Sequence, residues 1–227
     1  MTAIARLPER ALRTARVYGL RGTATRISRL LLQRVRAHHR HLWYELDLRG
    51  SRSRRELPAG FELTRAEDLD LADIAALPEA PSVPVMSGLR AKGHEVWLVR
   101  GGGRVVFVCW IFRDRAPVGG VSGGWIDLPS TIVCLEDSLT VPELRGRGIA
   151  PGAWSELADQ LHDEGVHAIV TKVEDWNNAS HVAVSKVGFQ EIATMTLDRR
   201  WGRTRVTVEA SGGGTGRLLG SLISNPG

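Results

Sequence analysis

The sequence predicts an α/β (α+β) domain over residues 58–209, with a basic helical segment before it and a glycine-rich tail after it. Three observations lead to this prediction. Two β-rich runs joined by three glycines indicate a hairpin at residues 94–112. A strand, a glycine-bearing turn, an amphipathic helix and a second strand succeed one another over residues 131–173. Arginine is concentrated in the first 55 residues, which favours an appendage over a core element.

Length and composition fit one domain of ordinary size with additional segments. A chain of 227 residues with 43% hydrophobic residues can bury a substantial core. The two cysteines, Cys109 and Cys134, both lie in apolar, strand-like runs. We therefore expect two buried thiols in a reducing, cytoplasmic compartment, and neither a zinc site nor another metal site.

The charge of the chain is divided unevenly along its length. The first 55 residues contain 14 arginines and no lysine, against only Glu9, Glu45 and Asp47. That segment has a charge of +11, so the other residues carry −6 of the total of +5. A basic segment on a mildly acidic domain typically binds nucleic acid, an anionic membrane or an acidic protein surface. Of these partners, nucleic acid is not expected here.

Residues 23–42 are predicted to be helical, because Ile27, Leu30, Leu31 and Val35 share one side and arginines surround the rest. The helix is too short and too charged to span a bilayer. Two interpretations remain open. The helix lies peripherally on an anionic membrane, held by its apolar stripe and its arginines. Alternatively, it packs on its own domain or on a second subunit in a homodimer.

The other elements are predicted from alternation, turn residues and helical spacing. Residues 42–48 form a strand or a docking segment and residues 49–55 a linker, so that residues 1–57 make up the extension. Within the domain we expect a strand at 61–65, a helix at 68–76, a proline-rich loop at 78–88, hairpin strands at 94–100 and 104–112, and a short strand at 125–128. Strands at 191–197 and 204–208 then precede a flexible tail at 210–227.

Glycines precede the amphipathic helix that begins near Ile149 and ends near Glu164. The first N–H groups of a helix have no intrahelical acceptor, and Gly146 and Gly148 leave room for a large anion in front of them. This combination predicts a phosphate-binding loop. The dinucleotide-binding spacing is absent, and no lysine followed by serine or threonine continues the loop, which excludes the two best-known phosphate motifs.

The remaining pattern is Arg-x-x-Gly-x-Ala from Arg145 to Ala150, preceded by Val141 and Pro142. It resembles the acyl-CoA pyrophosphate loop of the GNAT N-acetyltransferase superfamily. Downstream, the interval from Asn177 to Phe189 resembles the asparagine, helix and Lys-x-Gly-Phe turn of the same family. The resemblance covers residues 131–199. It implies the GNAT fold, in which helices flank a central mixed, mostly antiparallel sheet of six to seven strands.

The resemblance also implies acetyl-CoA as co-substrate and assigns its contacts. The pyrophosphate is expected on the backbone N–H groups of the loop, with added charge from two arginines, although plain solvation is an equal alternative for Arg147. The small polar Ser180 is expected near the CoA arm, but a local helix cap is equally compatible with it. The implied set comprises Arg145, Gly146, Arg147, Gly148, Ile149 and Ala150 for the pyrophosphate, Leu139, Thr140 and Val141 for pantetheine and the thioester oxygen, and Asn177 and Ser180 at the second strand.

A carboxylate is required to take the proton from an amine acceptor. The run Leu135-Glu136-Asp137 resembles the Leu-Glu-Asp of polyamine acetyltransferases and related enzymes, in which the glutamate acts through water. Strand alternation places Glu136 and Asp137 on opposite faces unless a bulge intervenes. Glu136 is the favoured base, while Asp137 and a mechanism without a base remain open.

One position departs from the family pattern. Many GNAT enzymes have a tyrosine seven residues after the asparagine to protonate the leaving thiolate, and here that position is Val184. The two tyrosines, Tyr18 and Tyr44, both lie in the N-terminal segment. A thiolate can also leave unassisted or through water, so catalysis stays compatible with this departure.

The resemblance implies an N-acetyltransferase that moves an acetyl group from acetyl-CoA to a primary amine. An amino sugar, a small amine such as a polyamine, and a protein amine are the candidate acceptors. The acceptor loops are expected at residues 78–92 and 119–130. The alternative is a GNAT-fold module that binds acyl-CoA and regulates or scaffolds without turnover, a reading that the valine at position 184 favours slightly.

Overall fold

The computed structural model describes residues 36–119, 124–200, 203–211 and 213–224. Contacts divide the chain into two compact units. The larger unit comprises residues 40–196 and 206–227 and holds the elements discussed below, except for the ends of three strands at residues 36–39, 197–200 and 203–205. The smaller unit comprises residues 1–39 and 197–205, and its described part includes an ion pair of 2.7 Å between His38 and Asp198.

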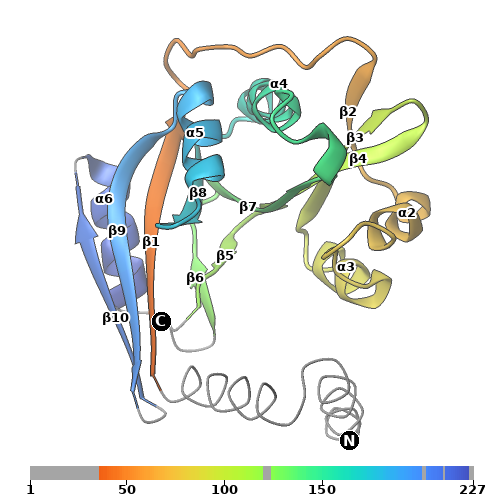
Figure 1. The fold of residues 1–227 in the computed structure, drawn as a ribbon. Helices are drawn as coiled ribbons and strands as arrows, with labels where there is room; N and C mark the ends of the chain where they lie inside the picture. Colours follow the sequence, from red (N-terminus) through yellow and green to blue (C-terminus); the bar gives the residue numbers. More distant parts are fainter. Residues whose placement is uncertain (1–35, 120–123, 201–202, 212, 225–227) are drawn as a thin grey trace, which may run out of the picture. The chain divides into compact units, whose positions relative to one another are not determined.

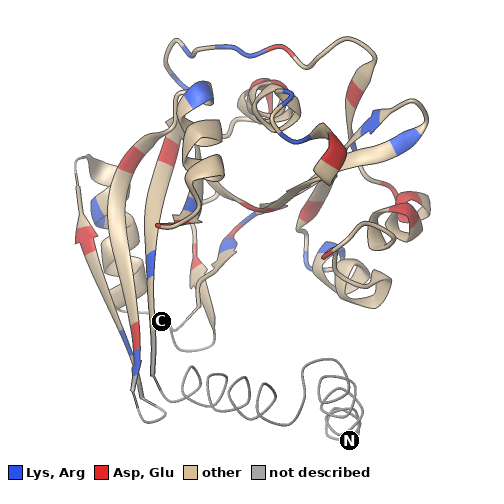
Figure 2. Ribbon diagram, viewed as in Figure 1, with Lys and Arg blue, Asp and Glu red and all other residues tan. Residues whose placement is uncertain are grey.

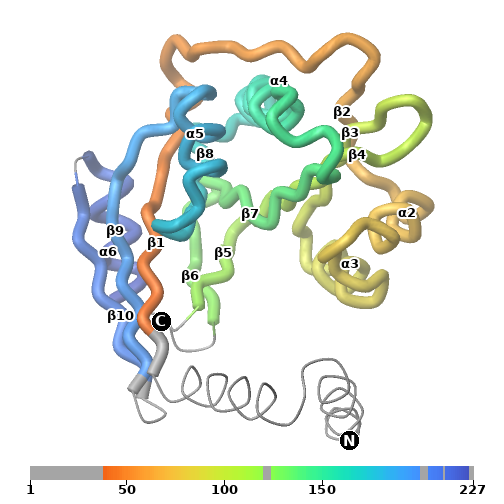
Figure 3. Tube along the Cα trace, in the orientation of Figure 1, coloured from red at the N-terminus to blue at the C-terminus, as the bar shows by residue number. Residues whose placement is uncertain are grey.

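An eight-stranded sheet forms the centre of the structure, in the order β10-β9-β1-β8-β7-β4-β3-β2 (Figures 1 and 3). It is mostly antiparallel, with one parallel pair between β7 and β8. The strands are β1 (Arg36–Asp47), β2 (Phe61–Arg65), β3 (Glu95–Gly101), β4 (Arg104–Phe112), β7 (Ile132–Thr140), β8 (Ala168–Glu174), β9 (Gln190–Arg200) and β10 (Arg203–Ala210). A separate hairpin pairs β5 (Arg115–Pro117) with β6 (Trp125–Asp127).

Two hydrophobic clusters cover the two faces of the sheet. On one face, α4 (Ile149–Asp163) and α5 (Asn178–Val187) lie side by side and bury Leu157 and Val184 against β7 and β8 (Figure 1). The other face is covered by η1 (Asp68–Asp70), α2 (Leu71–Ala75), α3 (Val83–Arg90), α6 (Gly214–Ser224) and the β5–β6 hairpin, around the buried Trp43 and Trp110. The mixed sheet flanked by helices is the predicted fold class, with eight strands in place of six to seven.

The structure corrects the sequence prediction at the N-terminal side of the domain. Residues 36–42 belong to β1, not to a helix, and the rest of the predicted helix lies outside the described residues. β1 pairs antiparallel with β8 from His41 opposite Glu174 to Asp47 opposite Ala168. Alternate side chains of β1 therefore enter opposite faces, which buries Trp43 on one and Leu46 on the other. A strand of the central sheet thus precedes residue 58, the predicted start of the domain.

The predicted linker also packs on the domain. Arg52 and Arg54 form ion pairs with Asp159 of α4, at 2.8 Å and 3.1 Å. The backbone at Leu57 lies so close to Gly152 that an added Cβ there would be 2.7 Å from the Leu57 Cα. The segment between β1 and β2 is therefore held along α4, as the ribbon shows (Figure 1).

Two further predicted segments differ from the structure. Residues 83–90 of the predicted proline-rich loop form α3, because Pro84 stands in the first turn, where a missing N–H costs nothing. The predicted flexible tail contains α6, which buries Leu219 and Ile223 against the sheet. Their spacing of four residues places both on one helix face.

Charged residues of both signs are spread over the described ribbon (Figure 2). Most of the arginines of the basic segment lie outside the described residues. The structure therefore tests neither the membrane nor a second subunit as the partner of this segment. None of the described helices is long and apolar enough to cross a membrane. Cys109 and Cys134 are both buried, and burial raises the pKa of each thiol, so neither is a ready nucleophile.

Candidate functional site

β7 and β8 separate soon after they meet. Their parallel pairing extends only from Ile132 opposite Ala168 to Cys134 opposite Val170. Beyond these residues β7 continues beside β4, and β8 continues beside β1. We call the opening between the two diverging strands the fork. It interrupts the backbone hydrogen bonding in the middle of the sheet.

A β-bulge turns two carboxylates towards the fork. The register between β4 and β7 shifts between Val108 and Trp110, so that Asp137 and Ser138 together face Cys109. Asp137 adopts a left-handed backbone conformation with φ of 49°, a conformation that aspartate tolerates better than most residues. Regular alternation would have separated Glu136 from Asp137. With the bulge, both line the same cavity.

That cavity has a volume of about 340 Å³ and passes through the fork. Glu136 and Lys172 enter it from the face of Trp43 and Trp110, and the α4 and α5 residues enter from the other face. It brings together four of the predicted site residues, namely Glu136, Asp137, Asn177 and Ser180. The full lining is His41, Glu136, Asp137, Ser138, Trp154, Thr171, Lys172, Val173, Glu174, Asn177, Ser180 and Val184.

Glu136 forms an ion pair across the fork. Its Oε1 lies 2.6 Å from the Nζ of Lys172, and the two side chains are only 11% and 13% exposed. Burial raises the pKa of Glu136, and the Lys172 ammonium opposes that rise. Conversely, the Glu136 carboxylate raises the pKa of Lys172 against the effect of burial. Burial and the Lys172 ammonium therefore act on the pKa of Glu136 in opposite directions, and burial has the larger effect.

The predicted phosphate loop has the geometry of an anion site at a helix N-terminus. Gly146 and Gly148 have φ of 76° and 84°, and a Cβ added at either would meet no atom within 4 Å. The N–H groups of Arg145 and Arg147 bond within the turn, to Pro142 O at 3.3 Å and Leu144 O at 3.4 Å. The N–H groups at positions 148 to 150 stand at the start of α4, which lacks intrahelical acceptors for them. Pyrophosphate oxygens fit this open, donor-rich surface.

Of the three residues predicted to pair with pantetheine, Thr140 has the suitable orientation. Val141 donates its N–H to Val106 O at 3.0 Å, and Leu139 lies opposite Val108. Because peptide groups alternate along an antiparallel strand, the N–H and C=O of Thr140 point away from β4, into the fork. The Nε of Arg145 donates to that carbonyl at 3.1 Å.

At the second strand, Asn177 caps α5 and accepts the Ser180 N–H at 3.2 Å through its Oδ1. The capping side chain is therefore that of Asn177, while Ser180 contributes the capped backbone N–H, and both residues line the cavity. Val184 is buried and also lines it. Tyr44 comes from β1 to bond the Nδ1 of His181 at 2.9 Å, and it is not among the residues that line the cavity.

Lys172, His41 and Trp154 are among the residues of the cavity lining for which the sequence predicted no site role. Lys172 is the single cation of the strand Ala168–Glu174, whose other residues before Glu174 are apolar or threonine, and a charged residue in such a run indicates a buried charge with a partner. His41 lies in the segment predicted to be helical, so its place opposite Glu174 could not be foreseen. Trp154 lies within the predicted amphipathic helix, and its Nε1 donates to Ser138 Oγ at 3.2 Å.

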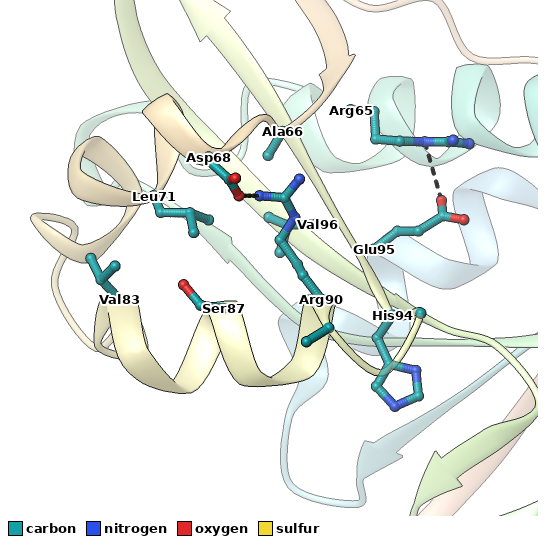
Figure 4. A pocket seen from close by; sticks show the side chains of 12 residues that line it. Arg65, Ala66, Asp68, Leu71, Val83, Ser87, Arg90, His94, Glu95 and Val96 are labelled. Atoms are coloured by element: carbon teal, nitrogen blue, oxygen red, sulfur yellow. Dashed lines mark hydrogen bonds and ion pairs between the residues drawn. The ribbon is translucent and has the colours of Figure 1, made fainter.

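A larger cavity of about 770 Å³ lies between α3 and the strands β2 and β3 (Figure 4). Arg90 extends across it to an ion pair with Asp68, and Arg65 pairs with Glu95 at 3.4 Å. Its charged groups are therefore compensated within the wall. Residues 83–91 of the predicted acceptor loop contribute to this cavity, but none of the predicted cofactor or catalytic residues does. The chemistry-bearing groups gather at the fork instead.

A family model described as "Acetyltransferase (GNAT) family" matches residues 76–189, which include β7, the phosphate loop and β8. No curated protein matches the sequence.

Solved structures share the fold at low sequence identity. An acetyltransferase of the GNAT family from Colwellia psychrerythraea has a TM-score of 0.53 and 15% identity, over 76% of this chain and 60% of that chain. A putative GNAT acetyltransferase from Novosphingobium aromaticivorans has a TM-score of 0.51 and 16% identity, over 77% and 66%. A Drosophila protein has a TM-score of 0.53 and 14% identity, over 80% and 58%. The chain thus spans about 58 to 66% of the length of these proteins.

Proposed function

The chain belongs to the acetyltransferase (GNAT) family, and on that basis we propose that it transfers an acetyl group from acetyl-CoA to a primary amine. The observation that carries the proposal is the fork. Its cavity contains the buried carboxylate of Glu136, and β7, which carries Glu136, continues through Thr140 to the glycine turn before the N-terminus of α4. This arrangement suits a thioester that enters from the α4 face and an amine that enters from the opposite face.

We propose that the N–H groups of Gly148, Ile149 and Ala150 hold the pyrophosphate, aided by the positive end of the α4 dipole. Thr140 offers its N–H and C=O to the pantetheine arm. The guanidinium of Arg145 donates a hydrogen bond to the Thr140 carbonyl. Pantetheine would displace this guanidinium from the carbonyl, and Arg145 could then pair with a phosphate. Arg147 is exposed and adds charge to the same loop.

In the transfer step, the amine nitrogen attacks the thioester carbonyl carbon and forms the new C–N bond while the C–S bond breaks. Glu136 accepts the amine proton, directly or through a water molecule. A backbone N–H in the fork stabilises the charge that develops on the carbonyl oxygen. Since the buried Val184 has no proton to give, the thiolate takes its proton from solvent. The products are an amide and free CoA.

The acceptor is a primary amine of one of three classes, an amino sugar, a small amine or a protein amine. Release of free thiol from acetyl-CoA, measured with glucosamine, spermidine and a short peptide with a free N-terminus, tests the proposal. Acceptor-dependent release that is lost in Glu136→Gln supports it. Saturable binding of CoA, without thiol release in the presence of any of these amines, would favour the alternative of a catalytically silent acyl-CoA-binding module. The valine at position 184, where the family pattern has a tyrosine, is the observation that favours this alternative.

A further inference from the structure

Lys172 is held by three partners in the fork. Its Nζ donates to Glu136 Oε1 at 2.6 Å and to the Pro117 carbonyl at 2.9 Å, and it lies 5.5 Å from the centre of the Trp43 ring. An ammonium group has three N–H donors, so two oxygens and one aromatic face account for all of them. The side chain is therefore fixed in position, at 13% exposure.

The partners come from three different parts of the fold. Trp43 lies on β1, directly opposite Lys172 of β8, and Pro117 ends β5. Glu136 stands on β7, two residues beyond the last pair between β7 and β8, and Lys172 stands at the matching position on β8. The ammonium consequently spans the fork at its narrow end, next to the place where the thioester and the amine must meet.

We propose that Lys172 is a positioning residue, which orients the Glu136 carboxylate across the fork and keeps it ionised so that it can accept a proton. This inference rests on the proposed function. It explains how a carboxylate with so little exposure can act as a base. Without a cation beside it, the pKa of a buried glutamate rises by up to about 3 to 5. A carboxyl group that is already protonated cannot accept the proton of the amine.

The other groups around Glu136 cannot replace the cation. Asp137 on β7 raises the pKa of Glu136 further, and so does burial, while the Cys134 thiol supplies only a weak donor at 3.4 Å. Across the cavity, His41 of β1 is 3.8 Å from Glu174 of β8, and β4 contributes the apolar Trp110 opposite Glu136. Lys172 is the cation that the described part of the chain pairs with Glu136.

Lys172 is itself a primary amine beside the proposed base, which raises the question of whether it is acetylated. Only the neutral amine attacks a thioester, and Lys172 is held as an ammonium by its carboxylate and its indole face. We therefore expect Lys172 to remain unmodified after incubation with acetyl-CoA. Peptide mass spectrometry tests this, and stoichiometric acetylation of Lys172 would overturn the positioning role.

The main test is the pH profile of Lys172→Met, with Lys172→Arg as the matched control that keeps the charge. We measure kcat/KM for acetyl-CoA with the amine, among glucosamine, spermidine and the peptide, that is turned over fastest. In Lys172→Met the acidic limb should move upward by about one pH unit or more, so that activity at a pH below the limb falls about tenfold or more and recovers at high pH. Lys172→Arg should keep the limb close to its wild-type position. An unshifted limb in Lys172→Met, or an equal loss at every pH in both variants, would overturn the proposal.

A second readout does not depend on turnover. In Lys172→Met the folded-state pKa of Glu136 rises further above its unfolded value, so the folded state binds the proton more strongly. Stability should therefore fall as pH rises from below the unfolded pKa through the folded one, more steeply than in the wild type. The double variant Glu136→Gln/Lys172→Met should lose this additional slope. Parallel pH dependences of the melting temperature in wild type and Lys172→Met would contradict the proposal. If the wild type acetylates no amine, the proposed function fails. The pH dependence of the melting temperature in wild type and Lys172→Met still shows whether Lys172 controls the ionisation of Glu136.

Discussion

Gly148 offers a sharp test of the phosphate loop. It precedes α4 with φ of 84°, and a Cβ added there would meet no protein atom within 4 Å. The Cβ of Gly148→Val therefore contacts no atom of the folded chain. The strain of a side chain in the left-handed conformation is about 1 to 2 kcal/mol. For a protein of this size, each 1 kcal/mol lowers the melting temperature by about 2 to 4 °C, so the variant should still fold.

The effect on CoA should be much larger. The valine side chain would occupy the space in front of the helix N–H groups, where the pyrophosphate is expected. A hydrogen bond to a charged group is worth about 1.5 to 3 kcal/mol, so the loss of two such bonds weakens binding by about 3 kcal/mol or more. This corresponds to an increase in Kd of about 100-fold.

Gly165→Val is the matched control. Gly165 follows α4 at its other end, has the same φ of 84° and the same open space, and lies away from the glycine turn that precedes α4. Calorimetric titration with CoA and thermal unfolding should show similar losses of stability in the two variants, but a large loss of affinity only in Gly148→Val. Wild-type affinity in Gly148→Val, or equal losses in both, would refute the assignment of this loop.

Three further predictions concern the base, the packing of the domain and the basic segment. Glu136→Gln should lower kcat/KM by about 10²-fold near neutrality, with partial recovery at high pH, where the amine deprotonates in solution. Because burial raises the pKa of Glu136, wild-type activity should fall as pH drops through that pKa. A pH profile unchanged by the substitution would reassign the base to Asp137 or to none. Gly152→Ala should cost about 1 to 3 kcal/mol, because the new Cβ would lie 2.7 Å from Leu57 Cα and 2.9 Å from Glu56 O, whereas an unchanged melting temperature would show that residues 56–57 do not pack on α4. If the basic segment binds anionic lipid, the full chain should co-sediment with phosphatidylglycerol vesicles at low salt and less at high salt; a chain beginning at Arg36, which retains β1, should not, and equal sedimentation of the two would exclude the segment as the anchor.

Local patterns in the sequence were sufficient for the elements that form the phosphate loop. The glycine turn and the apolar stripe from Ile149 to Leu161 define α4, and alternation identifies the hairpin of β3 and β4. These signals depend on neighbours a few residues apart. They also lead to the family resemblance, and through it to Glu136, Asp137, Asn177 and Ser180, which the structure gathers around one cavity.

Pairings between distant residues could not be predicted in the same way. The insertion of β1 beside β8 depends on the register of His41 with Glu174, more than a hundred residues apart, and no local pattern specifies it. The Glu136–Lys172 pair depends on where the parallel strands diverge. For α6, by contrast, the spacing of Leu219 and Ile223 was a usable signal, which the adjoining glycines obscured.

The most direct test of the site is a crystal structure of the protein with bound CoA. We predict pyrophosphate oxygens within hydrogen-bond distance of the Gly148, Ile149 and Ala150 N–H groups, the pantetheine arm beside Thr140, and the thiol in the fork near Glu136. Arg145 should have left the Thr140 carbonyl that it contacts at 3.1 Å in the absence of CoA. CoA bound between α3 and β3, in the cavity that contains Arg90, with the fork unchanged, would contradict the assignment of the fork as the site of acetyl transfer.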